Sequence, residues 1–559
     1  MKSFKSVLRC GIAALTLSVS VTRILAAPAA AQSAARFDFV EYAGESQTAA
    51  SDSYANPVLP GFHPDPSIVK VGDDFYMVTS TFSWFPGLPV LHSRDLVNWT
   101  QIGNAVDRSG MVDFADLSLT GDGLYAPAIT YHDGTFYILN TCVRCEGNFL
   151  LTAADPAGSW SDPVLLDFGG IDPSLYVDED GRGWITYNDA PAVEPRYEGH
   201  RAIWIREFDL ASNQLLGEPI LLVDGGFDPS TNPIWAEGPH IYKVDGWYYL
   251  LAAEGGTADQ HSQTIYRSRN VTGPYAPGPV NPILTQRDLP ADRPDRVEAT
   301  GHADFVQLDD GSWWGVFLAT RPFARQDTLM GRETFLLPVE WRDGWPIFLD
   351  QGEPVPMTAP RPNLSPSAGT DWSVWREDFN DGTLGHGWLR IRGINPVQDR
   401  MIADGALHLI PSAATLGDRT MPVFAGQRLR HHTASYTARV SFTPGAEGDF
   451  AGLAAVASET AFVALGIRGT GEGRTIALLN RDSATDPAGG EVAAAQPFSG
   501  YTAELRIAFD EGTADFAWRT PGGRWQMLAE DVDVTHMASV RSNLFTGVVA
   551  GPYAVRGGD

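Results

Sequence analysis

Residues 234–251 read IWAEGPHIYKVDGWYYLL, a pattern with three parts. Glu237 stands just ahead of a run typical of a β-strand, an Asp-Gly pair marks a tight turn, and an aromatic-rich run typical of a second strand follows. The stretch therefore predicts a β-hairpin with a carboxylate at the mouth of its first strand.

The same pattern occurs five times in the first two thirds of the chain. Each copy begins with what we call a head residue, which lies roughly 11–12 positions before an aromatic residue of the second strand. The copies recur roughly every 50–65 residues, a period typical of blades or arrays. Five units of this length, each with room for four strands, predict an all-β fold with a five-bladed β-propeller over residues 55–353.

The head residues of the five copies are Asp65, Ala126, Asp172, Glu237 and His302. Equivalent positions in the blades of a propeller point at one axis, so three carboxyl groups and a histidine are expected to meet in a single funnel. One such acid alone is more simply explained as a strand cap or a turn residue. Three acids in register weigh against that explanation, because like charges brought together cost energy without a chemical use.

The bulk composition limits the classes of partner. The 559 residues allow two or three domains, and 57 Gly with 39 Pro suit an all-β protein with many turns. Lys and Arg number 40 against 68 Asp and Glu, so the net charge of 40 − 68 is −28. Such an acidic chain argues against nucleic acid or an anionic membrane as partner, whereas a neutral sugar remains suitable.

Three cysteines are present, at positions 10, 142 and 145. A structural zinc site needs about four ligands, and Cys142 and Cys145 have no second pair to complete one. A thioredoxin-like role would require a βαβ context, which the sequence lacks. We interpret the two residues as structural thiols or as one local disulfide.

The N-terminal residues 1–35 are typical of an export signal. Basic residues at 2, 5 and 9 precede an apolar run at 11–21, and Ala29–Ala31 provide a small-residue cleavage site. The apolar run is too short for a membrane span, so we expect a periplasmic or secreted protein. Residues 36–54 are polar, and we expect them to form a flexible segment.

A second domain follows the repeats. Residues 354–372 are rich in Pro, Ser and Ala and are typical of a linker. Runs such as 435–442 and 501–509 alternate apolar and polar residues, which predicts a β-sandwich over residues 373–559. The sequence stops just after the strand-like run 548–555, where such a sandwich would usually continue, so we expect that a terminal strand is missing.

Acids that meet in a funnel suit glycoside hydrolysis. One carboxyl group protonates the leaving oxygen, and a second either attacks the anomeric carbon or activates water. A separation of roughly 6.5–9.5 Å leaves room for water and gives inversion, and a third carboxylate near the acid would raise its pKa. Chain order alone does not assign the three roles, although Trp235 and Pro239 beside Glu237 favour its protonated form.

Aromatic residues after the first hairpin are a further candidate. Phe82 and Trp84 lie in the stretch 79–87, TSTFSWFPG. Their rings suit stacking on a sugar, and packing between blades explains them equally well.

Residues 56–67, NPVLPGFHPDPS, resemble the opening motif of glycoside hydrolase family 43. The branches they resemble most are β-xylosidases and α-L-arabinofuranosidases with an appended concanavalin A-like β-sandwich. Further matches lie at 170–174, 235–240, 300–304 and 331–334. The resemblance implies a five-bladed propeller and an inverting mechanism with Asp65 as general base, Glu237 as general acid and Asp172 as modulator of the acid's pKa.

The resemblance also implies a set of substrate-binding residues. His302 matches a central histidine that binds water or, in some members, calcium, and no cofactor is otherwise required. Arg332 matches an arginine that contacts the sugar and the modulator, and Phe82 matches an aromatic residue of the pocket wall. In relatives the sandwich helps to close the pocket, which favours exo cleavage. Tyr125 begins the run YAPA, where many xylosidases have Trp-Ala-Pro-His, and this departure leaves the exact sugar open.

The expected function is that of an exo-acting β-D-xylosidase on xylo-oligosaccharides. An α-L-arabinofuranosidase, alone or as a second activity, is the closest alternative, because the two sugars present similar hydroxyl arrangements. A non-catalytic carbohydrate-binding propeller is an alternative of another class. A fructan-active enzyme is disfavoured, because the motifs Asn-Asp-Pro-Asn-Gly and Arg-Asp-Pro do not occur.

Overall fold

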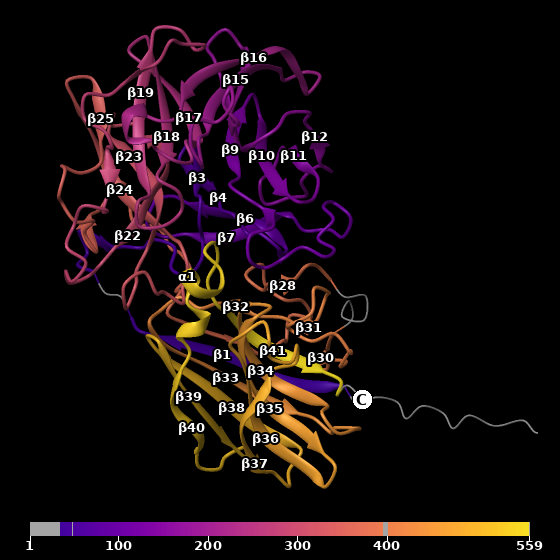
Figure 1. Ribbon diagram of the computed structural model, residues 1–559. Helices are drawn as coiled ribbons and strands as arrows, with labels where there is room; N and C mark the ends of the chain where they lie inside the picture. Colours follow the sequence, from indigo (N-terminus) through magenta and orange to yellow (C-terminus); the bar gives the residue numbers. More distant parts are fainter. Residues whose placement is uncertain (1–33, 47–48, 395–400, 558–559) are drawn as a thin grey trace, which may run out of the picture. The chain divides into compact units, whose positions relative to one another are not determined.

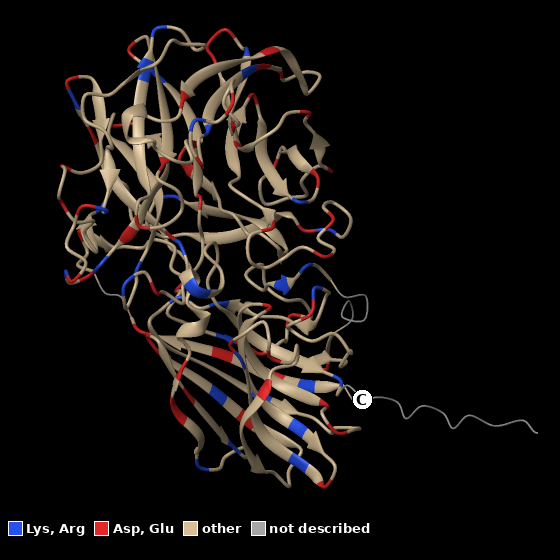
Figure 2. Ribbon diagram, viewed as in Figure 1, with Lys and Arg blue, Asp and Glu red and all other residues tan. Residues whose placement is uncertain are grey.

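The computed structural model describes residues 34–46, 49–394 and 401–557. These residues form many strands and very little helix, in a region of small sheets and a region of two large sheets (Figure 1). Acidic residues occur in loops of both regions, in keeping with the net charge of −28 (Figure 2). The expected export signal lies almost entirely outside the described residues. None of the helices that are described has the length and apolar character needed to cross a membrane.

Five sheets form the blades of the expected β-propeller, which is confirmed. Blade I contains β3 (Ser67–Val71), β4 (Asp74–Val78), β6 (Gly87–Ser93) and β7 (Thr100–Val106). Blade II contains β9 (Ala128–His132), β10 (Thr135–Val143), β11 (Gly147–Ala153) and β12 (Val164–Leu165), with β8 (Gly123–Leu124) on β10. Blade III contains β13 (Ile171–Val177), β14 (Gly183–Asp189), β15 (Ala202–Asp209) and β16 (Gln214–Asp224).

The remaining two blades follow directly in the chain. Blade IV contains β17 (Glu237–Val244), β18 (Trp247–Glu254) and β19 (Ser262–Ser268), with β20 (Ala276–Pro277) and β21 (Leu284–Thr285) both paired to β19. Blade V contains β22 (Glu298–Gln307), β23 (Trp313–Thr320), β24 (Glu333–Arg342) and β25 (Trp345–Ile347). The innermost strands β3, β9, β13, β17 and β22 contact one another in that order, and β22 contacts β3, which closes the ring.

The turn chemistry of the hairpins explains their register. In blade IV, Val244 pairs with Trp247, so the loop between β17 and β18 has two residues. Asp245 and Gly246 both have positive φ, at 50° and 72°. This is the type I′ geometry that matches the twist of two antiparallel strands and favours Asp-Gly.

The segment ahead of β3 fastens blade V to blade I. The Asn56 side chain donates to the Leu336 carbonyl at 3.0 Å and accepts from the Leu336 N–H at 3.0 Å. Leu59 and Thr334 exchange backbone hydrogen bonds, and the His63 N–H donates to the Arg332 carbonyl. Residues 56–63 therefore follow β24 and fix where Asp65 enters the funnel.

The C-terminal region is the expected β-sandwich. One sheet contains β1 (Ala35–Gly44), β27 (Val374–Glu377), β29 (Ile402–Ala403), β30 (Ala406–Leu409), β33 (Thr433–Ser441), β38 (Thr502–Asp510), β39 (Thr513–Arg519) and β40 (Gln526–Asp533). The other contains β31 (Val423–Phe424), β32 (Gln427–Arg428), β34 (Phe450–Ser458), β35 (Ala461–Thr470), β36 (Gly473–Arg481), β37 (Glu491–Pro497) and β41 (Val549–Val555). β41 pairs with β34 along one edge and with β31 and β32 along the other.

The expectation of a flexible segment at 36–54 is wrong for residues 36–44. Residues 35–44 form β1, which pairs with β33 in the sandwich, where Tyr42 lies opposite Tyr436. Phe37 and Tyr42 are buried in the sandwich core. The alternation of apolar and polar residues in this run is typical of a strand, but its partner lies about 400 positions later, so no local signal assigned it to the second domain.

A short pairing also lies within the expected linker. β26 (Thr358–Pro360) pairs with β2 (Ser53–Ala55), so the end of the N-terminal segment and the start of the linker run together. The linker and the segment that precedes the propeller are therefore partly ordered as strands.

Buried polar contacts join the propeller to the sandwich. Arg321 forms two hydrogen bonds to the Glu333 carboxylate, at 2.7 and 2.8 Å. Arg321 also donates to the backbone carbonyl of Arg430, and Glu333 accepts from the Gly61 N–H at 2.8 Å. A two-stranded pairing of β5 (Trp84–Phe85) with β28 (Arg390–Ile391) adds a second connection.

Replacing Glu333 with glutamine is expected to lower the free energy of unfolding by about 3–5 kcal/mol, because it leaves the buried Arg321 charge without a counter-charge. Glu340→Gln is the matched control on the same strand. The side chain of Glu340 is 63% exposed, and that of its ion-pair partner Arg342 is 45% exposed. An exposed pair contributes about 0–1 kcal/mol. Urea unfolding of both variants measures the difference, and equal losses would contradict the assignment of the buried pair.

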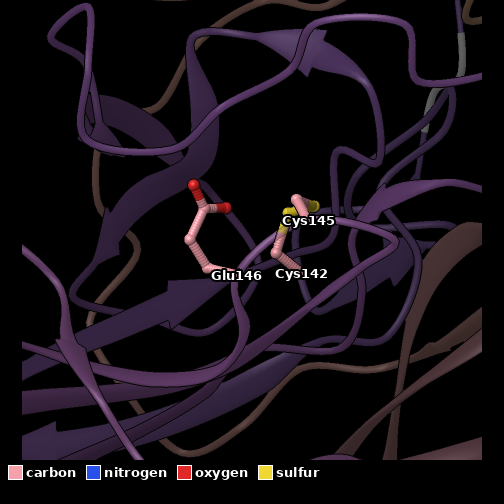
Figure 3. A group of neighbouring side chains, drawn as sticks. All are labelled: Cys142, Cys145 and Glu146. Atoms are coloured by element: carbon pink, nitrogen blue, oxygen red, sulfur yellow. A yellow bond between two sulfur atoms is a disulfide. The ribbon is translucent and has the colours of Figure 1, made fainter.

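Cys142 and Cys145 form a disulfide, with Cα atoms 5.3 Å apart (Figure 3). The second of the two sequence interpretations therefore holds. Glu146 lies beside them, and within the described part of the chain this is the single group of three Cys, His or acidic residues that could surround one ion. The sulfur atoms of Cys142 and Cys145 are bonded to each other, and the Glu146 carboxylate accepts a hydrogen bond from the Asp113 N–H. The group therefore has a structural role.

Candidate active site

The head residues of three blades share an unusual backbone conformation. Asp65, Asp172 and His302 have φ of 54°, 56° and 51°, in the left-handed region that non-glycine residues seldom adopt. The pairing register shifts at these positions in β13 and β22, which marks a β-bulge in each strand. A bulge re-aims side chains next to a site, and here the two bulges re-aim Asp172 and His302, while Asp65 has the same left-handed conformation just ahead of β3.

The head residue of blade IV is Gly238 rather than Glu237, which corrects the sequence-based register. Gly238 has φ 57° and lies two residues before His240, whose pairing with Leu251 matches that of Ser174 with Thr186. A Cβ at Gly238 would lie 2.8 Å from His302 Nε2. The imidazole therefore occupies the space beside Gly238, and the acid comes one residue earlier in the chain.

Asp65 is 4% exposed and is surrounded by donors. Arg332 Nη1 donates to Asp65 Oδ1 at 2.9 Å, and Ser80 Oγ donates to Oδ2 at 2.6 Å. His302 Nδ1 lies 3.7 Å from Oδ1. Both carboxyl oxygens act as acceptors and the guanidinium supplies a positive charge, so Asp65 is held in one orientation.

Asp172 has a poorer set of donors. It is 6% exposed, and the Gly238 N–H donates to its Oδ2 at 3.1 Å. Burial, followed by the negative charge of Asp65, raises the pKa of Asp172 to about 7. The hydrogen bond from Gly238 ties Asp172 to the residue that follows Glu237.

Glu237 is the third carboxyl group of the funnel and is 9% exposed. Burial, then the charges of Asp172 and Asp65, raise the pKa of Glu237 well above its ordinary value, while Arg332 and Arg201 act in the opposite direction. Burial and like charges both disfavour the ionised form of a carboxyl group. The surroundings of Glu237 therefore favour its protonated form, beside an Asp65 that is paired with a cation.

His302 is a neutral imidazole in this funnel. Burial lowers the pKa of His302 to about 3, against the opposing charge of Asp65. Calcium takes about six to eight oxygen ligands, and His302 belongs to no group of three potential metal ligands among the residues that the structure describes. On their own, the residues at this position do not fit a metal ion.

An aromatic wall borders the funnel. Phe82, with φ 52°, and Tyr125 have ring centroids 5.1 Å apart, and Phe545 lies 5.3 Å from the first and 5.7 Å from the second. The Arg332 guanidinium lies 5.6 Å from the Phe82 ring and 5.4 Å from the Phe545 ring. Of the three aromatic residues, Phe82 and Tyr125 were candidates from the sequence, and Phe545 comes from the sandwich.

Phe545 is a residue that the sequence did not identify. It follows α1 (Ser539–Ser542), and its carbonyl accepts from Arg332 Nη2 at 3.3 Å. Asn543 Oδ1 accepts from the Phe545 N–H at 3.0 Å, which shapes this loop. A Cβ at Gly331 would lie 2.6 Å from the Gly547 nitrogen, so the loop packs directly on the backbone beside Arg332.

Trp84 lies elsewhere and is fully buried. Its ring packs against Phe62 and against Phe424 of the sandwich, with centroid distances of 6.4 and 6.2 Å. Of the two open interpretations of this tryptophan, the structure supports packing. A ring in that position cannot reach a sugar in the funnel.

Comparison with known proteins agrees with this geometry. The family model for glycosyl hydrolases family 43 matches residues 54–346, and the model for the beta xylosidase C-terminal concanavalin A-like domain matches residues 376–559. A non-reducing end alpha-L-arabinofuranosidase from Bacteroides ovatus is 40% identical over 411 residues, which cover 72% of this chain and 74% of that protein. A xylosidase/arabinosidase from Butyrivibrio fibrisolvens is 38% identical over 410 residues, covering 71% and 76%.

Solved structures extend the similarity to both regions. A family 43 subfamily 12 protein retrieved from a capybara gut metagenome has a TM-score of 0.86 and 33% identity, over 94% of this chain and 100% of that one. A xylan beta-1,4-xylosidase from Bacillus halodurans has a TM-score of 0.81 and 30% identity, over 90% and 96%. The propeller, its carboxyl funnel and the appended sandwich define a glycoside hydrolase. The chain belongs to glycosyl hydrolases family 43.

Proposed function

We propose that this chain is an exo-acting, inverting β-D-xylosidase that releases xylose from the non-reducing ends of xylo-oligosaccharides. The observation that carries the proposal is the contrast between two carboxyl groups of one funnel. Asp65 is paired with Arg332 and Ser80, whereas Glu237 is buried among like charges that raise its pKa. Two carboxyl groups in different environments can take the two roles of base and acid.

In the proposed reaction Asp65 accepts a proton from a water molecule as that water attacks the anomeric carbon. Glu237 donates its proton to the glycosidic oxygen while the bond from that oxygen to the anomeric carbon breaks. The new carbon–oxygen bond forms on the opposite face, so the configuration inverts. Exchange of one proton from Asp65 to solvent and one from solvent to Glu237 restores the starting state.

Asp172 is proposed to keep Glu237 protonated, which predicts the direction of a pH shift. Asp172→Asn removes a negative charge that raises the pKa of Glu237, so that pKa falls. The alkaline limb of the kcat/KM profile is then expected to move to lower pH, together with a reduced maximum. A pH series on a xyloside measures both effects, and a limb that stays in place or moves to higher pH would count against the modulator role.

The second candidate is α-L-arabinofuranosidase, alone or as a second activity. It is favoured by the name of the relative from Bacteroides ovatus and by the names of relatives that combine the two activities. Tyr125 in the aromatic wall does not decide between the two sugars. Paired assays on the 4-nitrophenyl glycosides of β-D-xylose and α-L-arabinofuranose separate the two substrates.

One experiment tests the sugar, the exo mode and the stereochemistry together. Proton NMR of fresh hydrolysis of xylotriose, in which the first free xylose comes only from the non-reducing end, is expected to show α-xylose first, with xylobiose as the other product. Initial β-xylose would overturn inversion, and release of internal fragments from longer chains would overturn the exo mode. A chain that binds oligosaccharides but hydrolyses neither nitrophenyl glycoside would be the carbohydrate-binding propeller.

We also propose that the protein is exported. The basic, apolar and small-residue pattern of residues 1–35 supports this. The disulfide between Cys142 and Cys145 gives independent support, since disulfides persist mainly in oxidising compartments. Cell fractionation of the full chain tests the proposal.

A further inference from the structure

Trp235 stands outside the carboxyl funnel in a backbone conformation that a bulky residue seldom adopts. Its φ is 54°, in the left-handed region. The Trp235 N–H donates to the Gly199 carbonyl at 2.9 Å, and the carbonyl of the preceding Ile234 accepts from the Gly255 N–H at 2.8 Å. Backbone hydrogen bonds on both sides therefore hold Trp235 in this unfavourable backbone conformation. Backbone strain of this kind is found at functional sites.

The chain runs from the funnel to solvent at this point. Glu237 is 9% exposed, Trp235 is partly exposed, and Ile234 is 38% exposed. Trp235 therefore lies on the outward side of Glu237. Since a general acid contacts the oxygen of the leaving group, a side chain beside Glu237 on its solvent side is a candidate contact for the leaving part of a substrate.

Arg201 adds a cation to the ring. Its guanidinium lies 4.6 Å from the Trp235 ring centroid, within the range of a cation–π contact. The guanidinium group carries five N–H donors. Arg201 also acts on Glu237, because its positive charge opposes the raised pKa of that acid. The guanidinium is thus near the acid and has donors for a ligand.

Two glycines border the edge of the ring and the side chain of Ile234. A Cβ at Gly199 would lie 3.6 Å from Trp235 Nε1, and a Cβ at Gly256 would lie 3.8 Å from Trp235 Cδ1. Larger side chains at these positions would cover the ring. Aromatic rings with a polar group beside them suit sugars, which present an apolar face together with hydroxyl groups.

We propose that Trp235 and Arg201 form the binding subsite for the leaving sugar of a neutral oligosaccharide. The ring stacks on the face of that sugar, and the guanidinium donates to its hydroxyl groups. This inference rests on the proposed function of the funnel and adds the residues that select the leaving part of the substrate. Substrates whose leaving group is a sugar therefore gain from the pair, and substrates with a very small leaving group do not.

The test compares two substrates that share the same transferred sugar. Xylobiose has a xylose leaving group, whereas β-D-xylopyranosyl fluoride releases a fluoride ion that cannot stack on a ring. Trp235→Ala is expected to lower the ratio of kcat/KM for xylobiose to kcat/KM for the fluoride by about tenfold or more. Trp235→Phe keeps a ring and is expected to recover part of the ratio. Arg201→Met is expected to lower the ratio and, by removing a positive charge, to move the alkaline limb to higher pH.

Trp525→Ala is the matched control. The Trp525 ring also carries stacked guanidinium groups, those of Arg506 and Arg519 at 4.2 and 4.4 Å, but it belongs to the sandwich. Its removal is expected to leave the ratio unchanged.

The outcomes separate this inference from the proposed function. If the unaltered protein hydrolyses neither xylose substrate, the same pair made with α-L-arabinofuranose is used, and inactivity on all four contradicts the proposed function. If the unaltered protein hydrolyses both substrates of a pair and Trp235→Ala changes kcat/KM for both by the same factor, the proposed leaving-sugar subsite is wrong. A selective loss on the disaccharide supports it, because misfolding or damage to the carboxyl groups would reduce both constants.

Discussion

Replacing Asp65 with asparagine is expected to lower kcat/KM on xylobiose by about 10²–10⁴-fold, the usual contribution of a general base. Asparagine has nearly the same shape, and its amide oxygen can still accept from Arg332 while its NH2 group faces the Ser80 hydroxyl, but it cannot take a proton from water. The deficit should be similar for good and poor leaving groups, because activation of water does not depend on the group that departs. Kinetics on aryl xylosides with leaving groups of different acidity measure this.

The control for that variant lies on the same blade. Asp73 is exposed in the turn between β3 and β4, and Asp73→Asn is expected to retain full activity. Thermal unfolding of both variants establishes that the fold is intact. If Asp65→Asn retained more than a tenth of the activity, the base would have to be sought elsewhere in the funnel.

Glu237→Gln is expected to lower kcat/KM on xylobiose by a similar factor of about 10²–10⁴, with a different signature. Xylose is a poor leaving group that needs a proton, whereas 2,4-dinitrophenolate departs without one. The loss should therefore be much smaller on 2,4-dinitrophenyl β-xyloside than on xylobiose. The alkaline limb of the pH profile should also disappear, because glutamine has no proton of raised pKa to lose.

Glu254 provides a demanding control for the acid. It lies at the end of β18 in the same blade, is 2% exposed, and burial raises its pKa to about 7. Glu254→Gln therefore changes a buried, high-pKa carboxyl group outside the funnel. It is expected to keep the ordinary dependence on leaving group, and the acid assignment would be wrong if Glu254→Gln rather than Glu237→Gln altered that dependence.

The head residues show which features follow from local sequence patterns and which depend on the assembled sheet. Repeated hairpins with Asp-Gly turns indicated five blades, because strand alternation and turn chemistry are local properties of a chain. The same repeats brought Asp65 and Asp172 to one axis. They placed the blade IV head one residue too early, at Glu237 instead of Gly238, because the bulges that shift the register depend on backbone angles within the assembled sheet.

Long-range pairing accounts for the other differences. The first described strand, β1, enters the sandwich and not the propeller, and Phe545 returns from the sandwich to the wall beside Phe82. Trp84 was an equal candidate for sugar stacking and packing, and only its neighbours Phe62 and Phe424 decided between them. Periodicity can indicate a strand, but it does not indicate which segment hundreds of residues away that strand contacts.

The sequence by itself determined the all-β class, the number of blades, the sandwich and the three acids, because each follows from spacing, alternation or turn residues that act over a few positions. The tertiary structure decided how those acids differ from one another. Arg332 is paired with Asp65 and the Gly238 N–H with Asp172, while Glu237 is left among like charges. The protonation of a carboxyl group depends on burial and on neighbouring charges, and folding alone brings those neighbours together.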